Sequence, residues 1–231
     1  MTARTPADFV ASVLALDPRL AVFDCDGTLW AGDAGEGFFN WELDRGLVSE
    51  ETIRWARPRY AAYKAGKVSE DDMCAEMVTM HCGMREDHIQ QLAEEYFAGF
   101  TQNIFPEMRE LVQRLQQSGC DVWAVSSTNV WVIRSAMKYF GIPQEKILAA
   151  SVHVDDDGKI TGRILRVPTG AGKVQAIREV IRQTPDAAFG NTRWDLEMLQ
   201  LAKNPFVVNP TPELESLARP HGWPIYRPVI G

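Results

Sequence analysis

Short apolar runs alternate along the chain with longer stretches in which apolar residues recur at helical spacing. The first run, residues 20–24, is bounded by Pro18 and Gly27 and is typical of a buried parallel strand. Similar runs and helical stretches follow in turn, at residues 106–119 (helix), 122–125 (strand), 130–140 (helix), 173–182 (helix), 187–190 (strand), 194–202 (helix) and 206–208 (strand). With a helix at residues 6–16, this pattern predicts an α/β fold with a doubly wound parallel sheet, which binds ligands beyond the carboxyl ends of its strands.

Two segments depart from this alternation. Residues 36–100 carry apolar and aromatic positions at helical spacing with few β-branched residues, which predicts a helical insert. Residues 151–163 place Asp157-Gly158 between two β-branched runs, which predicts a β-hairpin. We therefore expect a core domain formed by residues 1–35 and 101–231, and a helical domain formed by residues 36–100.

Composition is that of an ordinary globular protein, since 45% of the 231 residues are hydrophobic and the net charge is −7. No run of lysine or arginine forms a basic stripe, so we expect no nucleic-acid partner. The first nine residues lack the pattern of a signal peptide, and no stretch approaches the length of a membrane span. We expect a cytoplasmic protein with no membrane partner. The sequence alone does not indicate which oligomeric state the protein has.

Cysteine usage fits a reducing compartment, because the four cysteines are scattered without a Cys-x-x-Cys pair. Cys74, His81, Cys82 and His88 do cluster along the chain, but their spacing matches no common zinc pattern. We interpret them as ordinary side chains of the helical insert.

Polar and charged residues gather where the predicted strands end and helices begin. They are Asp24, Asp26, Ser126, Lys173, Asn191 and Asp195. In an extended segment, residues two apart face the same way, so Asp24 and Asp26 share one pocket. Like charges at close range raise the pKa of at least one carboxyl group, as a general acid requires, and Gly27 allows the sharp turn that follows.

The segment Asp24-Cys-Asp-Gly-Thr28, placed after an apolar strand, resembles the first motif of the haloacid dehalogenase superfamily. Its phosphatase members carry Asp-x-Asp-Gly-Thr at this point. Ser126, Lys173 and Asp195 follow in the order of the later motifs, so the resemblance covers nearly the whole chain. The insert at residues 36–100 looks like the cap domain of the phosphoserine phosphatase-like branch.

The resemblance implies a role for each motif residue. Asp24 would attack phosphorus to give an aspartyl-phosphate, and Asp26 would act as general acid and then as general base. Thr28 would steady the loop and bind phosphate, together with the serines that follow the second strand, Ser126 and Ser127. Lys173 would neutralise both carboxylate and phosphate, so that two anions can meet.

The same resemblance implies a Mg²⁺ cofactor. Its oxygen ligands would come from the Asp24 carboxylate, the Asp26 backbone carbonyl and the last motif, with Asn191 and Asp195 as candidates. Asn191 stands where phosphatases of this family commonly show Asp, and an amide oxygen ligates without charge. We therefore expect weaker Mg²⁺ binding, which Asp195 compensates directly or through water.

Substrate recognition in this branch falls to the cap and to the segment after the first motif. There Asp33 and Glu36 could bind a substrate ammonium group, or serve as solvated loop carboxylates. Three arginines of the insert, Arg54, Arg57 and Arg59, are better read as surface residues than as partners of a substrate carboxylate. Four aromatic residues, Trp30, Phe38, Phe39 and Trp41, are better read as cap packing than as a pocket for a cation.

The partner we expect is a small phosphorylated metabolite, with phosphoserine first and phosphocholine, histidinol phosphate or another amine-bearing phosphate next. Phosphoryl transfer, as in a mutase, shares the same intermediate, and the loss of charge at Asn191 leaves open a non-catalytic phosphate-binding module. Dehalogenation is a weaker reading, because it leaves no alkoxide for Asp26 to protonate. A nucleotide-binding loop at Gly170–Lys173 fails, because Val167 and Val174 replace residues that it requires.

Overall fold

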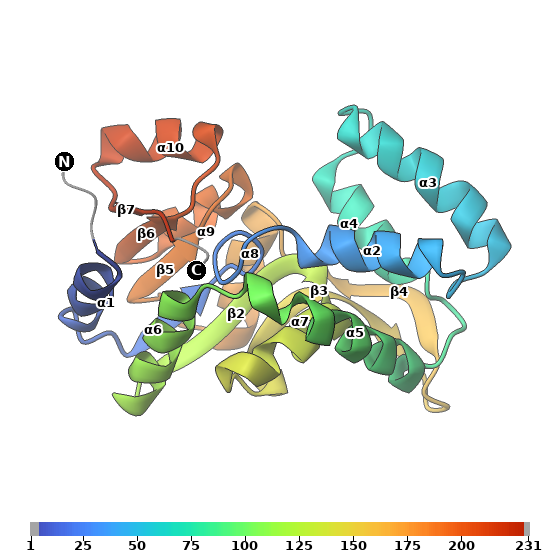
Figure 1. Cartoon of the computed structure of the whole chain (residues 1–231), viewed down its shortest axis with the longest axis horizontal. Coiled ribbons are helices and arrows are strands. Elements are labelled where there is room, and N and C mark those ends of the chain that lie inside the picture. The colour runs from blue at the N-terminus through green and yellow to red at the C-terminus, as the bar shows by residue number, and fades with distance from the viewer. Residues whose placement is uncertain (1–4, 229–231) are drawn as a thin grey trace.

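A seven-stranded sheet forms the centre of the protein, for which the computed structural model describes residues 5–228. The strand order is β4-β3-β2-β1-β5-β6-β7, and only β3 and β4 pair antiparallel (Figure 1). The strands are β1 (Leu20–Phe23), β2 (Asp121–Asn129), β3 (Ile147–Val154), β4 (Ile160–Arg166), β5 (Ala187–Gly190), β6 (Asn204–Val208) and β7 (Ile225–Tyr226). The predicted α/β class and the β3–β4 hairpin are confirmed.

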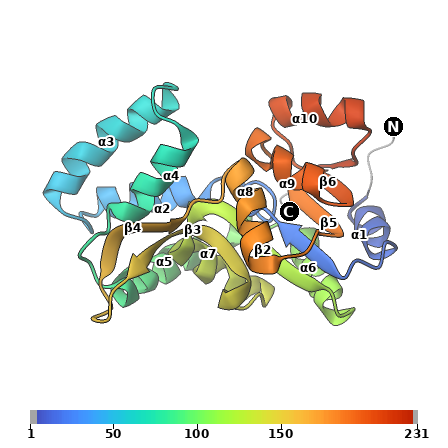
Figure 2. The same ribbon diagram turned by 180° about the vertical axis from the view of Figure 1, so that it is seen from behind.

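Helices cover both faces of this sheet. The helices outside the insert are α1 (Pro6–Leu14), α6 (Pro106–Gln117), α7 (Val130–Met137), α8 (Ala171–Ala176), α9 (Leu196–Leu201) and α10 (Pro212–Ala218). Figure 1 shows α6 and α7 in front of the sheet, and Figure 2 shows α8 on the opposite face. Single helical turns lie at Thr101–Asn103, Lys138–Phe140, Gln144–Lys146, Ile177–Ile181, Arg193–Asp195 and Arg219–His221.

Alternation along β1 divides the core into two layers. Ala21 and Phe23 belong to the cluster that includes α1, α5, α6 and α7. Leu20 and Val22 point the other way and belong to the cluster with α8, α9 and α10. Because both faces of the strand are buried, its sequence is a continuous apolar run, and the chain leaves the sheet directly into Asp24.

Four helices form the insert: α2 (Ala34–Asp44), α3 (Glu50–Lys64), α4 (Glu70–Thr79) and α5 (Glu86–Phe100). Helices α2 to α4 stand to one side of the core above the β3–β4 hairpin, whereas α5 lies along α7 (Figure 1). The carboxylate of Glu86 on α5 accepts a hydrogen bond from Arg134 on α7 at 2.8 Å. The helical character of the insert is confirmed, and its division from the core at residues 35 and 100 stays a prediction.

The structure differs from the sequence-based expectation at three elements. Strand β2 continues to Asn129 instead of ending at residue 125, because Asn129 pairs with Ala150 of β3 beyond an irregularity in register. Helix α8 begins at Ala171, so Lys173 lies inside its first turn. The strand at residues 206–208 is not the last one, since α10 and the two-residue strand β7 follow it.

Candidate active site

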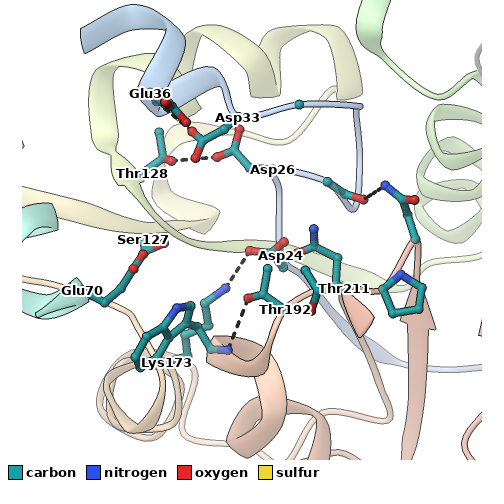
Figure 3. Close-up of a pocket in the computed structure, with 16 residues that line it drawn as sticks. Asp24, Asp26, Asp33, Glu36, Glu70, Ser127, Thr128, Lys173, Thr192 and Thr211 are labelled. Carbon is teal, nitrogen blue, oxygen red and sulfur yellow. Dashed lines mark hydrogen bonds and ion pairs between the residues drawn. The ribbon is translucent and has the colours of Figure 1, made fainter. Parts of the chain in front are cut away.

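A cavity of about 520 Å³ lies at the carboxyl ends of β1, β2, β5 and β6, on the side that faces α2 and α4 (Figure 3). Segments far apart in the sequence meet there, as expected for a doubly wound sheet. Its lining consists of Asp24, Asp26, Gly27, Gly32, Asp33, Glu36, Glu70, Ser127, Thr128, Lys173, Asn191, Thr192, Trp194, Asn209, Pro210 and Thr211. Seven of the ten residues predicted for the site line the cavity: Asp24, Asp26, Asp33, Glu36, Ser127, Lys173 and Asn191.

Asp24 is held at the end of β1 by both of its carboxylate oxygens. Oδ1 accepts a hydrogen bond from Lys173 Nζ at 2.7 Å, and Oδ2 accepts one from Thr28 Oγ1 at 2.8 Å. Burial, reinforced by the charge of Asp195, raises the pKa of Asp24 to about 6, against the opposing effect of Lys173. Thr28 is fully buried, so its hydrogen bond holds the Asp24 carboxylate in a fixed position.

Lys173 lies between two carboxylates with only 1% of its surface exposed. Its ammonium group donates to Asp24 Oδ1 at 2.7 Å, to Asp195 Oδ1 at 2.6 Å and to the carbonyl of Val125 at 3.0 Å. Burial alone would lower the pKa of Lys173, but the charges of Asp195 and Asp24 outweigh it and raise that pKa. All three ammonium hydrogens thus have acceptors, and the positive charge is fixed beside the nucleophile.

Asp195 fixes Lys173 from the side away from the cavity. While Oδ1 accepts from Lys173, Oδ2 accepts from the backbone amides of Asn191 and Thr192, each at 2.9 Å. The side chain is 1% exposed and does not line the cavity. Asp195 thus positions Lys173 and the Asn191 loop, and its contribution to a metal site, directly or through water, stays a prediction.

Asp26 points toward α2, next to Asp24 but with different partners (Figure 3). Its Oδ1 accepts hydrogen bonds from the indole of Trp30 at 2.8 Å and from the amide of Ala34 at 2.5 Å. Thr128 Oγ1 donates to Oδ2 at 2.7 Å. Burial, followed by the charge of Asp33, raises the pKa of Asp26 to about 7, a value suited to a group that both gives and takes a proton near neutral pH.

The end of β2 presents Ser127 and Thr128 to the cavity, while Ser126 lies beneath its surface. Ser126 is 1% exposed, and its Oγ accepts a hydrogen bond from the amide of Thr128 at 3.1 Å. The irregular pairing between Val125 and Asn129 turns the next two side chains into the cavity. Ser127 therefore lies where a phosphate oxygen can reach it, and Ser126 supports the bend.

The loops after β1, β5 and β6 interlock around Gly27. Gly27 has φ +75°, and a Cβ atom at this position would lie 1.8 Å from Asn191 Nδ2. Thr211 donates its backbone N–H to the carbonyl of Asn191 at 2.9 Å, and Asn209 Nδ2 donates to the carbonyl of Gly27 at 3.2 Å. The β6 loop thus ties together the two loops that carry Asp26 and Asn191.

The donor set around this loop fits Mg²⁺. Asp24, Asp26 and Asn191 line one wall and supply carboxylate, backbone carbonyl and amide oxygens, which are the hard ligands that Mg²⁺ prefers. Within residues 5–228, no three His, Cys, Asp or Glu side chains are grouped as a metal site. A cation would therefore depend on the neutral oxygens as well as on Asp24.

The residues assigned from sequence to substrate binding divide into two groups. Asp33 and Glu36 line the cavity, although Asp33 also caps α2 by accepting from the amide of Glu36 at 2.8 Å. The three arginines of α3 do not line it; two of them bind other carboxylates, Arg57 with Asp44 and Arg59 with Glu76. Trp30, Phe38 and Phe39 are buried, which confirms their role in packing.

Among the lining residues that were not assigned to the site from sequence are Glu70, Thr128, Trp194, Asn209 and Thr211. Two of them carried a usable signal, because Asn209-Pro210-Thr211 follows an apolar run in the same way as the predicted site residues do. Glu70 and Trp194 carried no such signal in the sequence, since both line the cavity only because of where α4 lies relative to the loop after β5. Thr128 depends on the irregular end of β2.

We expect Asn209→Gly to lower kcat by up to about tenfold, because it removes one hydrogen bond between the loops. Asn209 has φ +46°, a conformation that Gly adopts freely, so the backbone should keep its course. Phosphate-release kinetics and thermal unfolding, measured together, check this. An unchanged kcat would show that the hydrogen bond to Gly27 has no part in positioning.

The sheet places the paired Asp24 and Lys173 on the wall of a cavity at its carboxyl edge. A family model described as haloacid dehalogenase-like hydrolase matches residues 21–200. The chain therefore belongs to the haloacid dehalogenase-like hydrolase family, and the resemblance found in its motifs is confirmed.

Several relatives carry phosphatase names. A histidinol-phosphatase of Neisseria meningitidis serogroup C is 28% identical over 218 residues, which are 90% of this chain and 97% of the relative. A phosphoserine phosphatase of Mycobacterium tuberculosis is 28% identical over 221 residues, which are 89% of this chain and 69% of the relative. These names agree with the enzyme class predicted from the motifs, a phosphoric monoester hydrolase.

A solved structure shares the whole architecture. A protein of unknown function from Bordetella pertussis Tohama I has a TM-score of 0.79 at 21% identity, covering 90% of this chain and 97% of that one. This likeness supports the fold. No helix within residues 5–228 is both long enough and apolar enough to cross a membrane.

Proposed function

We propose that this protein is a Mg²⁺-dependent phosphomonoester hydrolase that acts on a small metabolite through an aspartyl-phosphate. The observation that carries the proposal is the pairing of the Asp24 carboxylate with the buried ammonium group of Lys173 at 2.7 Å, on the wall of a cavity. A carboxylate repels a phosphate dianion unless a fixed cation lies beside both. The family match and the phosphatase names of relatives support the same chemistry.

In this mechanism Asp24 attacks phosphorus and the bond from phosphorus to the ester oxygen breaks. Asp26 gives its proton to the departing alkoxide, which leaves as the alcohol. Water then attacks phosphorus, Asp26 takes a proton from it, and Asp24 is released with inorganic phosphate. Thr128, Trp30 and the amide of Ala34 keep the Asp26 carboxyl group in one place through both steps.

Other parts of the site stabilise charge. Ser127 and nearby backbone amides would donate hydrogen bonds to phosphoryl oxygens, while Asp195 keeps Lys173 in place. Mg²⁺, held by Asp24, the Asp26 carbonyl and Asn191, would supply further positive charge to the phosphate. Because Asn191 is neutral, we propose that this cation binds more weakly than at a site built with a third carboxylate.

Two other functions share this geometry. A mutase or phosphotransferase would pass the phosphoryl group from Asp24 to another alcohol instead of water, and analysis of the products separates the two. A phosphate-binding module without turnover would explain Asn191, but it gives no reason for Asp26 to be held beside Asp24 by three donors. Hydrolysis is therefore our proposal.

The test is phosphate release with and without Mg²⁺, from wild type and from Asp24→Asn. We expect Mg²⁺-dependent release from wild type and a loss of at least about 1000-fold in Asp24→Asn, which keeps the side-chain size but removes the nucleophile. Asp44→Asn is the matched control, because Asp44 is exposed and pairs only with Arg57 on the surface. Equal release from Asp24→Asn and wild type would contradict the proposal.

A further inference from the structure

Three carboxylates form the wall of the active-site cavity that faces the insert: Asp33, Glu36 and Glu70. They come from the start of α2 and from the first residue of α4. Tyr63 donates its hydroxyl hydrogen to Glu70 at 2.5 Å, which fixes this side chain. Burial raises the pKa of both Asp33 and Glu70, so a cation bound beside them would stabilise their ionised form.

Positive charge is scarce around the same cavity. Lys173 is the one basic residue that lines this cavity within residues 5–228, and its charge is already neutralised by Asp24 and Asp195. Within residues 5–228, no arginine lines this cavity. Within the described residues, no basic residue of the cavity lining is therefore left to neutralise Asp33, Glu36 and Glu70.

A second cavity, of about 60 Å³, opens from this wall. It shares Asp33, Glu36, Glu70, Ser127 and Thr128 with the first cavity, so the two are adjacent. Its other side carries aromatic rings, thioethers and a thiol, from Tyr60, Tyr63, Met73, Met77 and Cys74, together with the side chain of Lys64. Aromatic faces and polarizable sulfur beside carboxylates suit a small organic cation.

A cation of the protein already approaches this pocket. The ammonium group of Lys64 lies 3.0 Å from Glu36 Oε2 and 5.4 Å from the centre of the Tyr60 ring. Its side chain is 55% exposed, so a ligand can displace it at little cost. The pairing shows that the carboxylate and ring can bind an ammonium group together.

A substrate carboxylate, by contrast, would meet basic side chains that are already paired, including Lys64 with Glu36. Arg57 is bound to Asp44, and Arg59 makes two hydrogen bonds of 2.7 Å to Glu76. A substrate carboxylate in the cavity would lie close to Asp33, Glu36 and Glu70. Repulsion between like charges would weaken the binding of such a substrate.

From these observations we infer that the substrate is the phosphate ester of an amino alcohol that carries a positive charge and no carboxylate, with its cationic end bound between Glu70, Glu36 and Tyr60. This inference rests on the proposed function, and it reverses the expectation that phosphoserine is the first choice. Glu70 becomes a specificity-determining residue that sequence reasoning had not found.

Three esters of nearly equal size test the inference. Ethanolamine phosphate has the ammonium group alone, phosphoserine adds a carboxylate, and propyl phosphate replaces the ammonium by a methyl group. We expect kcat/KM for ethanolamine phosphate to exceed that of each of the other two by at least about tenfold, the effect of one desolvated charge interaction. Equal values for all three, or a preference for phosphoserine, would overturn the inference and leave the phosphatase proposal intact.

Glu70→Gln identifies the residue responsible. We expect it to raise KM for ethanolamine phosphate about tenfold, with kcat nearly unchanged and with propyl phosphate unaffected. Glu51→Gln, an exposed change on α3, is the matched control. If Glu70→Gln acts only on the structure, kcat/KM should fall equally for ethanolamine phosphate and propyl phosphate. That result would show that Glu70 does not determine specificity.

A binding measurement separates the two proposals. Calorimetry on Asp24→Asn, which needs no turnover, should rank the dissociation constants of the three esters in the same order as kcat/KM. The same order in a protein that releases no phosphate from any ester would support the binding pocket and reject the hydrolase. Indistinguishable dissociation constants would reject the cationic pocket, whatever the activity.

Discussion

Replacing Lys173 with Met is expected to abolish phosphate release and to lower the free energy of unfolding by about 3–5 kcal/mol, the usual effect of removing one partner from a buried ion pair. Lys173 neutralises Asp24 and Asp195, and both carboxylates are almost fully buried. Without it, Asp24 lacks the buried ammonium group that neutralises its carboxylate when the phosphate arrives. Urea unfolding and phosphate release measure the two effects separately.

A double variant separates the contribution of Lys173 to stability from its contribution to catalysis. Lys173→Met combined with Asp195→Asn removes one of the two unpaired charges, while Asn can still accept hydrogen bonds from the amides of Asn191 and Thr192. We expect this double variant to recover much of the lost stability and none of the activity. Recovery of turnover would show that Lys173 acts only on the fold.

Lys203→Met is the control for charge removal alone. Lys203 pairs with Asp186 at 2.7 Å on the surface, with 64% of its side chain exposed. A surface ion pair contributes less than about 1 kcal/mol, so the variant should keep both stability and turnover. Similar losses in Lys203→Met and Lys173→Met would mean that the buried pair has no special part.

The parts of the site that were predictable from sequence are local. Asp24, Asp26 and Thr28 follow one apolar strand within five residues, and the alternation of buried positions fixes which way they point. Lys173 could be placed because a helix starts beside it, although the structure starts that helix two residues earlier. Short-range patterns and a motif were enough for these residues.

The unpredicted parts depend on pairings between distant segments. Strand β7 has two residues, too few to show periodicity, and Tyr226 stacks on Phe9 at 4.0 Å. Thr128 reaches Asp26 only because Asn129 pairs with Ala150 across an irregular register. Neither contact leaves a local trace in the sequence.

The negative wall of the cavity depends on three-dimensional placement for the same reason. Glu70 begins a helix after Ser69, which caps it, and in sequence it resembles any first-turn acid. Only the position of α4 over the core directs it to the cavity that holds Asp24. The preferred substrate class could therefore not be chosen before the insert was placed.

Substituting Gly27 by Ala is the second change for which we expect a large effect. A Cβ atom there would lie 1.8 Å from Asn191 Nδ2 and 2.8 Å from its Cγ, far inside van der Waals contact. Since the carbonyl of Gly27 is bonded to Asn209, the loop cannot move away without breaking that hydrogen bond. We expect at least about a 100-fold loss of kcat/KM, equivalent to about 2.7 kcal/mol of transition-state stabilisation.

Gly66→Ala separates this collision from ordinary backbone strain. Gly66 has φ +71°, nearly that of Gly27, but nothing lies within 4 Å of its Cβ position. Both variants should lose about 1 kcal/mol of stability from the left-handed conformation. Only Gly27→Ala should also lose activity and show a smaller rise in melting temperature when Mg²⁺ is added, because Asn191 is displaced from the cation. If the two variants behave alike in both measurements, the packing of Asn191 against Gly27 has no part in the active site.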